Sequence, residues 1–395
     1  MEDMTMIGGE VEAGFEPVRK AFMDNFARRG DIGAAVCVYW HGRPVVDLWG
    51  GITDPDTGRP WTRDTLQLVY SATKGATATA VHMLVQRGEL DLDAPVAALW
   101  PEFAANGKAD IPVRWLLSHQ AGLVTLDQPV PLADALRWHP MAEALAAQRP
   151  VWTPGGAHGY HGRTWGWLVG EVIRRVSGRS PGRFFAEEIA SPLDLDFFIG
   201  LPTDERHRVS RMVHSKPEID LTTVPLELVP EELRERVAAW STPTSLSNRA
   251  YMVTDPAGID FNSFEVQAAE LPSSNGIGTA RALARMYAAL IGEVDGVRLL
   301  DRETLTLALK EQSAGMDQVL VAPSRFSSGY QLPTMDNPMT GPNAFGHNGR
   351  GGSLAFADPE IGIAFSYTMN HIVSGDSDVR AATLVCALLD SLSRQ

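Results

Sequence analysis

Strand-like segments stand at both ends of this 395-residue chain, and helix-like segments lie between them. Near the N-terminus, residues 33–40 and 45–50 are apolar runs on either side of a short turn, which predicts a β-hairpin. Near the C-terminus, residues 328–332, 353–357 and 363–368 predict further antiparallel strands. One sheet assembled from both ends would leave the middle of the chain as an insertion.

Helical periodicity dominates the middle of the chain and also appears beside the strands. Helices are expected at residues 16–29, 140–148, 165–176, 279–291 and 379–392.

These segments predict an α/β (α+β) fold, with an antiparallel sheet built from both chain ends, flanking helices and an inserted, mostly helical domain. The expected boundaries are residues 1–75 and 300–395 for the sheet domain and 76–299 for the helical domain. An active-site cleft should lie between the two, lined by residues from both. Residues 323–342 are rich in Ser, Pro, Gly and Asn, which predicts a long loop bordering the cleft.

The overall charge of the chain argues against some classes of binding partner. A net charge of −14 and a pI near 5.2 argue against a broad basic face for nucleic acid or an anionic membrane. No apolar run is long enough for a membrane-spanning helix, and residues 1–17 resemble no signal peptide. We expect a soluble, cytoplasmic protein that takes a small-molecule substrate, and self-association into a homo-oligomer stays open.

The two cysteines are too few for a disulfide framework or a zinc site. Cys37 lies in a strand-like run and Cys386 in the closing helix-like run, and both are expected to be buried thiols without a catalytic role. The expected apolar face of that last helix consists of Ala382, Val385, Cys386, Leu389 and Leu392.

The strongest chemical signal is an SxxK motif, Ser71 to Lys74, followed by small residues at 75–81. Residues three apart share a helix face, so the Ser71 hydroxyl and the Lys74 amine would be neighbours. A serine becomes a nucleophile when a base takes its proton, and a lysine serves as that base only when burial lowers its pKa. The alternative is a helix cap at Ser71 and a surface residue at Lys74.

Two further segments carry polar groups in unusual settings. A loop rich in Pro and Gly, residues 154–162, delivers Tyr160 just before a helix, where the alternative is an aromatic ring packed at a domain seam. Residues 345–352 place His347, Asn348, Gly349 and Arg350 among glycines before an apolar strand, and glycines permit a close backbone approach to a ligand. The alternative for this second segment is a simple glycine-rich turn.

Competing motifs fit less well. Ser180 satisfies the GxSxG pattern, but it lies in an expected helix-to-helix turn instead of a strand-to-helix elbow. His158 and His161 lack a carboxylate partner at metal-ligand spacing, and no nucleotide-binding glycine pattern is complete. Neither a metal nor a cofactor is therefore expected.

In this order and spacing, the three segments resemble class C β-lactamases, DD-peptidases of the penicillin-binding type and family VIII carboxylesterases. Four other segments match the same families: residues 115–123, 273–281, 356–360 and 368–370.

The resemblance implies that Ser71 begins a central helix between the two domains, with Tyr160 opposite. It also implies an oxyanion hole made by the backbone N–H groups of Ser71 and Arg350. Two departures stand out: Gly162 replaces an asparagine of the β-lactamase pattern, and His347, Asn348 and Gly349 replace a Lys-Thr-Gly triplet. The missing lysine and hydroxyl normally grip the lactam carboxylate, so the esterase branch fits better.

The predicted reaction is acyl transfer through an acyl-enzyme on Ser71, with Lys74 and Tyr160 moving the proton. A charged Lys74 would lower the pKa of Tyr160, and His347 would hydrogen-bond Tyr160 or the substrate. The predicted substrate is a carboxylic ester. The alternatives are an acyltransferase with an alcohol or amine acceptor, a β-lactamase or DD-peptidase, and a binding protein that has lost the chemistry.

Overall fold

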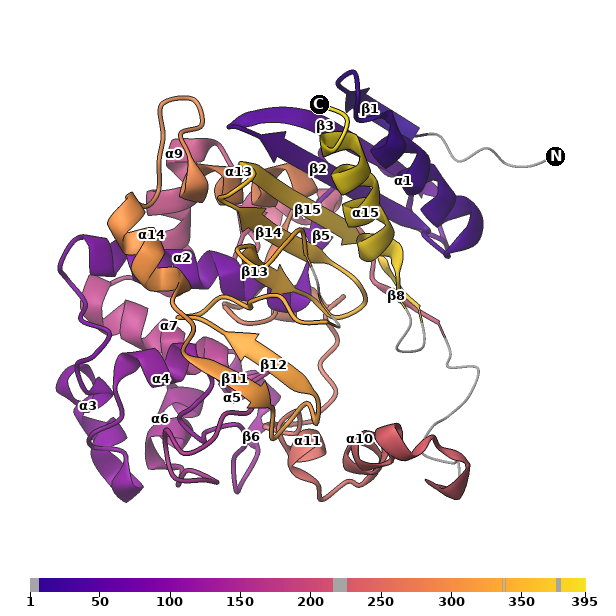
Figure 1. Ribbon diagram of the computed structural model, residues 1–395. Coiled ribbons are helices and arrows are strands. Elements are labelled where there is room, and N and C mark those ends of the chain that lie inside the picture. The colour runs from indigo at the N-terminus through magenta and orange to yellow at the C-terminus, as the bar shows by residue number, and fades with distance from the viewer. Residues whose placement is uncertain (1–6, 216–225, 336, 338, 374–377) are drawn as a thin grey trace.

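A computed structural model describes residues 7–215, 226–335, 337, 339–373 and 378–395. Its main sheet is antiparallel and has the strand order β1-β3-β2-β15-β14-β13, with β4 paired to β3. The strands are β1 (Ile7–Val11), β2 (Gly33–Trp40), β3 (Arg43–Asp54), β4 (Arg59–Pro60), β13 (Phe345–Asn348), β14 (Leu354–Asp358) and β15 (Ile363–Met369). Both chain ends therefore share one sheet, as the sequence predicts (Figure 1).

Side chains alternate between the two faces of this sheet, as the period of a strand requires. On β2, Val36 and Val38 enter one hydrophobic cluster, while Cys37 and Tyr39 enter another. The first cluster is closed by α1 (Glu16–Arg28) and α15 (Arg380–Leu392), which pack against each other, and the second by α13 (Ala280–Ile291).

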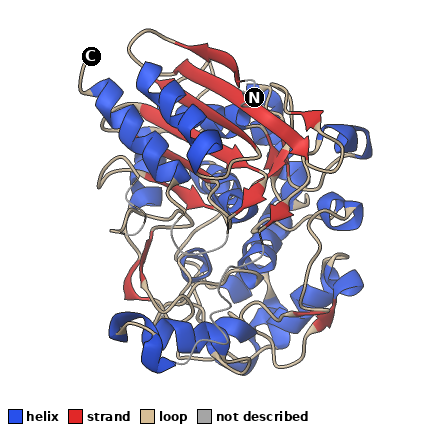
Figure 2. Cartoon of the chain, turned by 90° about the vertical axis from the view of Figure 1, so that its right-hand side faces the viewer, coloured by secondary structure: helices blue, strands red, loops and turns tan. Residues whose placement is uncertain are grey.

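Beside the sheet lies the mostly helical part, which Figure 2 shows in its lower half. Its central helix, α2 (Thr73–Gln86), is buried on every side from Thr73 to Leu84, and the small residues at 75–80 allow its neighbours to pack closely. The other helices are α3 (Val96–Leu99), α4 (Val113–Leu117), α5 (Leu132–Ala135), α6 (His139–Ala147), α7 (Thr164–Ser177), α8 (Pro181–Phe185), α9 (Ser191–Leu193), α10 (Glu231–Ser241), α11 (Leu246–Arg249), α12 (Phe264–Ala268) and α14 (Arg302–Leu309).

Short strands and single turns complete the chain. β5 (Gln67–Leu68), β10 (Ile277–Gly278) and β7 (Phe197–Phe198) form a small sheet, and the pairs are β11 (Ser313–Met316) with β12 (Pro323–Phe326), β16 (His371–Ile372) with β8 (Val213–His214), and β6 (Val130–Pro131) with β9 (Thr254–Asp255). The 3₁₀ and π turns are η1 (Tyr70–Ala72), η2 (Pro101–Gly107), η3 (Ala186–Ala190), η4 (Thr203–Arg208) and η5 (Leu226–Leu228).

One prediction for the C-terminal third is wrong, and another is wrong at its first four residues. Residues 328–332 form no strand, because Gly329 turns the chain at φ +99° and only Gln331 makes bridges, to Phe326 and Gly346. The predicted loop at 323–342 instead begins with β12, which pairs as a local hairpin with β11, six residues earlier, despite its loop-like composition.

The expected apolar face of α15 is out of phase by about one residue. The helix buries Leu384, Val385 and Leu388, while Cys386 and Leu389 are exposed. The apolar residues have helical spacing as predicted, but the face that packs against α1 and the sheet is the one next to the predicted face. Cys37 is buried as expected, and the expectation of burial for Cys386 is wrong.

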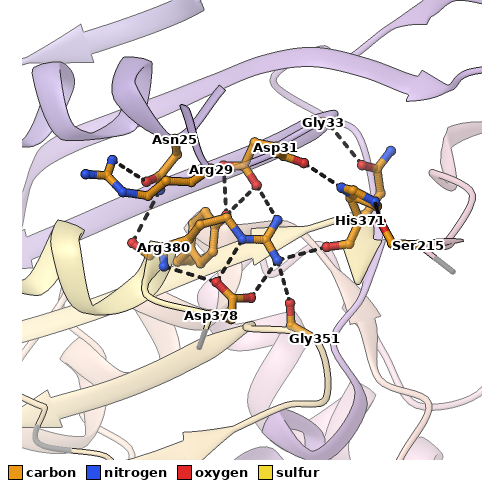
Figure 3. Close-up of polar contacts among 12 residues, drawn as sticks. Asn25, Arg29, Asp31, Gly33, Ser215, Gly351, His371, Asp378 and Arg380 are labelled. Atoms are coloured by element: carbon orange, nitrogen blue, oxygen red, sulfur yellow. Dashed lines mark hydrogen bonds and ion pairs between the residues drawn. The ribbon is translucent and has the colours of Figure 1, made fainter. Parts of the chain in front are cut away.

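A buried polar cluster joins the two ends of the chain (Figure 3). Arg380 pairs with Asp31 at 2.7 Å and with Asp378 at 2.6 Å, and it donates to the carbonyl oxygen of Gly351 at 2.9 Å. The Tyr367 hydroxyl donates to the Asp31 carboxylate at 2.6 Å. Burial raises the pKa of Asp31 to about 6, against the opposing effect of the Arg380 charge.

The division into a sheet domain, residues 1–75 and 300–395, and a helical domain, 76–299, stays a proposal. The position of α13 bears on it, because this helix comes from the second range and packs on β2, β14 and β15.

Candidate active site

Ser71 lies in η1, the single 3₁₀ turn that leads into α2, and its side chain is partly buried. The preceding residue, Tyr70, has φ +47°, a conformation that costs a non-glycine residue free energy and is maintained by its surroundings. Val69 supplies part of that support, because its N–H donates to Gly276 O at 2.9 Å and its carbonyl accepts from Ser353 Oγ at 2.9 Å. The turn is therefore fixed from both sides.

Lys74 is fully buried one helical turn further on, which contradicts the surface alternative. Its Nζ lies 3.2 Å from Ser71 Oγ, 3.1 Å from Gly162 O and 3.0 Å from Ser273 O. Burial lowers the pKa of Lys74 well below its ordinary value, and the positive charge of Arg163 lowers it further. A neutral amine can donate to both carbonyls and still present its lone pair to the Ser71 hydroxyl.

Tyr160 stands over the same amine, with Lys74 Nζ 4.8 Å from the centre of its ring. Burial raises the pKa of Tyr160 well above its ordinary value, and a hydrogen bond with Ser71 opposes this rise. Burial favours the uncharged form of both groups, so the pKa of Tyr160 rises; the effect that a charged Lys74 would have on it stays a prediction. Both groups are thus shifted toward their uncharged forms, an amine and a phenol.

The backbone of Tyr160 is held by Asp317, a buried residue between β11 and β12. Asp317 Oδ1 accepts from the N–H of Tyr160 at 3.0 Å and from those of Val319 and Leu320 at 2.9 Å each. Asp317 Oδ2 accepts from Ser324 Oγ at 3.0 Å. The sequence analysis missed this residue, since an isolated aspartate 157 positions from Tyr160 carries no local signal.

Gly162 occupies the position where the β-lactamase pattern has an asparagine. A Cβ added to Gly162 would lie 2.8 Å from the hydroxyl oxygen of Tyr251, so Tyr251 fills the space of the missing side chain. The sequence analysis missed Tyr251 as well, because its approach depends on how α11 packs against the loop.

The segment His347 to Arg350 ends β13 beside the Ser71 turn. A Cβ on Gly349 would collide with the Val69 carbonyl and with Ser353 Oγ, so only glycine allows this approach. Gly349 N–H donates to Ser353 O at 2.7 Å, whereas the N–H of Arg350 has no acceptor among the described residues. That free donor suits the oxyanion role expected for Arg350.

His347 is buried and uncharged, since burial lowers its pKa to about 3. Its Nδ1 donates to Asn348 O at 2.6 Å, which leaves Nε2 as a bare acceptor with no partner among the described residues. The predicted hydrogen bond from His347 to Tyr160 is therefore wrong: the two rings are neighbours, with their centres 6.0 Å apart, but no hydrogen bond joins them. The predicted bond to substrate stays a prediction.

A cavity of about 750 Å³ opens on these groups. Ser71, Tyr160, His347, Asn348, Gly349 and Arg350 all line it. Aromatic and aliphatic side chains form much of its wall: Tyr70, Trp240, Tyr251, Met252, Ile259, Phe261, Leu320 and Phe326. The site thus combines a nucleophile with an apolar pocket.

The competing motifs have structural roles. Ser180 caps the N-terminus of α8, and its Oγ donates to Glu270 Oε1 at 2.6 Å. His158 hydrogen-bonds Ser324 Oγ, and His161 Nε2 accepts from Leu123 N–H. Within the described ranges, no group of three or more His, Cys, Asp or Glu side chains could hold a metal ion.

The chain is similar to known esterases and to β-lactamase relatives. The profile of the β-lactamase family matches residues 19–389. The esterase/β-lactamase LipL of Mycobacterium tuberculosis is 38% identical over 374 residues, which cover 93% of this chain and 83% of LipL.

Solved structures also match almost the whole chain, and two of them are at least 36% identical to it. A family VIII carboxylesterase is 37% identical with a TM-score of 0.82, covering 98% of this chain and 100% of its own. A penicillin-binding protein homologue from Caulobacter crescentus is 36% identical with a TM-score of 0.83, at the same coverage. The resemblance and the fold class predicted from the sequence are confirmed, and the chain belongs to the β-lactamase family.

Proposed function

We propose that the protein hydrolyses carboxylic esters through an acyl-enzyme on Ser71. The observation that carries the proposal is the buried Lys74 amine, 3.2 Å from Ser71 Oγ, with two carbonyl oxygens in position to accept its two N–H groups. The remaining lone pair faces the Ser71 hydroxyl, which is what a general base requires. The esterase names of the most similar relatives agree with this reaction.

In the first step, Lys74 takes the hydroxyl proton while Ser71 Oγ bonds to the ester carbonyl carbon. The carbonyl oxygen becomes an oxyanion, which the N–H groups of Ser71 and Arg350 stabilise. The face of the Tyr160 ring supports the ammonium that forms on Lys74.

In the second step, the carbon–oxygen bond to the alcohol breaks. Tyr160 is protonated at rest and donates its proton to the departing alkoxide, and Lys74 returns a proton to Tyr160. Water then attacks the acyl carbon while the amine takes a proton from it. The bond to Ser71 Oγ breaks, Lys74 returns the proton to that oxygen, and the acid and the Ser71 hydroxyl are released.

Incubation with short-chain p-nitrophenyl esters, followed by intact-mass measurement, tests the proposal. We expect turnover and an acyl adduct that maps to Ser71 and disappears in Ser71→Ala. Ser180→Ala is the matched control and should retain both. An adduct at Ser180, or neither turnover nor adduct, would overturn the assignment.

The acyltransferase alternative differs only in the group that attacks the acyl-enzyme. Adding alcohols or amines to the same assay separates the two, because a transferase stays slow until its acceptor is present. We also propose that esters react far faster than cephalosporins, since His347 stands where the family triplet has its lysine.

No helix in the described part of the chain is long and apolar enough to cross a bilayer. The cytoplasmic location and the homo-oligomer stay predictions.

A further inference from the structure

Arg163 is a largely buried arginine without an anionic partner in the described part of the chain. Its Nη1 is buried and has no hydrogen-bond partner, and none of its N–H groups donates to another described residue. By contrast, the buried Arg380 pairs with two carboxylates, Asp31 and Asp378. Burying a guanidinium whose N–H groups have no acceptor lowers the stability of the fold, which suggests that a ligand supplies the acceptor.

The surroundings of Arg163 are aromatic and cationic. Its guanidinium carbon lies 5.2 Å from the centre of the Phe261 ring and 6.0 Å from that of Tyr251. These ring faces compensate for part of the lost hydration but accept no conventional hydrogen bond. Asp260 forms no ion pair with Arg163, and its Oδ1 accepts from Asn262 N–H at 2.9 Å.

Arg350 adds a second positive charge to the same wall. Both arginines line the cavity that contains Ser71, and the charge of Arg350 contributes to lowering the pKa of Arg163. Arg350 has no ion pair within the described residues. Two like charges facing one cavity repel each other unless an anion lies between them.

The guanidinium also lies close to the nucleophile. Arg163 directly follows Gly162, whose carbonyl accepts from Lys74, and Phe261 packs edge-on against Tyr70 at 5.1 Å. Tyr70 is the neighbour of Ser71 in η1. A group held by Arg163 would therefore belong to the same small molecule as the ester bonded to Ser71.

We propose that the cavity selects esters whose acyl part carries a carboxylate, and that Arg163, with Arg350, pairs with that group. This inference rests on the proposed ester hydrolysis and specifies its substrate class, half-esters of dicarboxylic acids. A planar guanidinium matches a carboxylate through two parallel hydrogen bonds, which a neutral acyl chain cannot replace.

The test compares the monoethyl esters of succinate, glutarate and adipate with ethyl butyrate, which shares their leaving group. We expect kcat/KM of the best half-ester to exceed that of ethyl butyrate by at least about 10-fold. In Arg163→Met this ratio should fall by about 10- to 100-fold, and Arg163→Lys should keep part of it.

Arg206→Met is the matched control. Arg206 also lies over a ring, 5.0 Å from the centre of Phe264, but it does not line the cavity. In this variant, the ratio of kcat/KM for the best half-ester to kcat/KM for ethyl butyrate should equal that of the unmodified protein. Equal losses on charged and neutral esters in Arg163→Met would make Arg163 a structural residue and overturn the proposal.

Inhibition of p-nitrophenyl butyrate hydrolysis adds a measurement on the unmodified protein, in case a variant fails to fold. Glutarate should inhibit competitively, and more weakly as salt increases, whereas butyramide should not. If neutral esters are hydrolysed, but half-esters are not preferred and glutarate does not inhibit, the carboxylate site is refuted and the proposed ester hydrolysis stands. Absence of any turnover or acyl adduct would instead refute the proposed function.

Discussion

Asp317→Asn tests whether the Tyr160 loop is held in its catalytic position by a buried carboxylate. The substitution keeps the shape of the side chain and removes its charge. If the amide oxygen replaces Oδ1, the N–H groups of Tyr160, Val319 and Leu320 keep an acceptor but lose the charge assistance. A hydrogen bond to a charged group is worth about 1 kcal/mol more than one between neutral groups, so three such bonds give about 3 kcal/mol.

The fourth hydrogen bond changes direction. The new amide group would face Ser324 Oγ, which now donates to Asp317, so Ser324 would have to accept and donate its own proton to His158. We therefore expect a loss of about 3 kcal/mol in unfolding free energy, measured by urea titration. A displaced phenol should also reduce kcat by about 10- to 100-fold.

The assay separates positioning from general destabilisation. The loss in kcat should increase with the basicity of the leaving alcohol, because a poorly placed Tyr160 protonates an alkoxide badly. Asp358→Asn is the matched control. Asp358 is buried, does not line the cavity, and accepts a hydrogen bond of 2.8 Å from Thr340 Oγ1. This substitution should lower stability and leave kcat unchanged. An equal kcat loss for all leaving groups in Asp317→Asn would refute the reasoning.

Further predictions concern the reacting groups and the chain ends. Tyr160→Phe should fold normally and lose about 10²- to 10⁴-fold in kcat, most for alkyl esters, and a small uniform loss would mean that the ring only packs. Because Lys74 must be deprotonated to act, kcat/KM should rise with pH and level off well below the ordinary lysine pKa of 10.5; a rise that continues to that value would contradict a neutral resting amine. Gly349→Ala should lower kcat by about 10-fold or more through the clash with the Ser71 turn, and unchanged kinetics would show that the loop can yield. Asp31→Asn should cost about 3 kcal/mol in unfolding free energy, because Arg380 keeps only its other carboxylate; an unchanged urea midpoint would contradict this.

The sequence predicted best those features that depend on near neighbours along the chain. Ser71 and Lys74 are three residues apart, so helical spacing alone places amine and hydroxyl together. The hairpin at 33–50 follows from two adjacent apolar runs around a turn. Residues 328–332 look like a strand by the same reasoning, but the turn at Gly329 depends on its approach to Ala78, which no local pattern reveals.

The sequence did not predict the pKa direction of buried groups or contacts between residues that lie far apart along the chain. The pKa direction of Tyr160 depends on how deeply the tertiary structure buries it, which the residue type does not encode. Asp317 and Arg163 gain their importance from contacts made across the fold, with the Tyr160 backbone and with the Phe261 ring. Recognising Arg163 required knowing that no carboxylate of the described residues pairs with it.

The order of strands in the main sheet also has a consequence for biosynthesis. Strand β2 leaves the ribosome early, yet its neighbour β15 pairs Ile363 with Trp40 and is translated more than 300 residues later. At about 5 to 20 residues per second, the hairpin β2–β3 waits roughly 15 to 65 s with one edge unpaired. During that interval the edge is a template for wrong pairing, and the nascent chain lacks the loop that carries Arg350. The site at Ser71 is therefore assembled only after β13 to β15 have been translated, although Ser71 itself is made about 275 residues before Phe345.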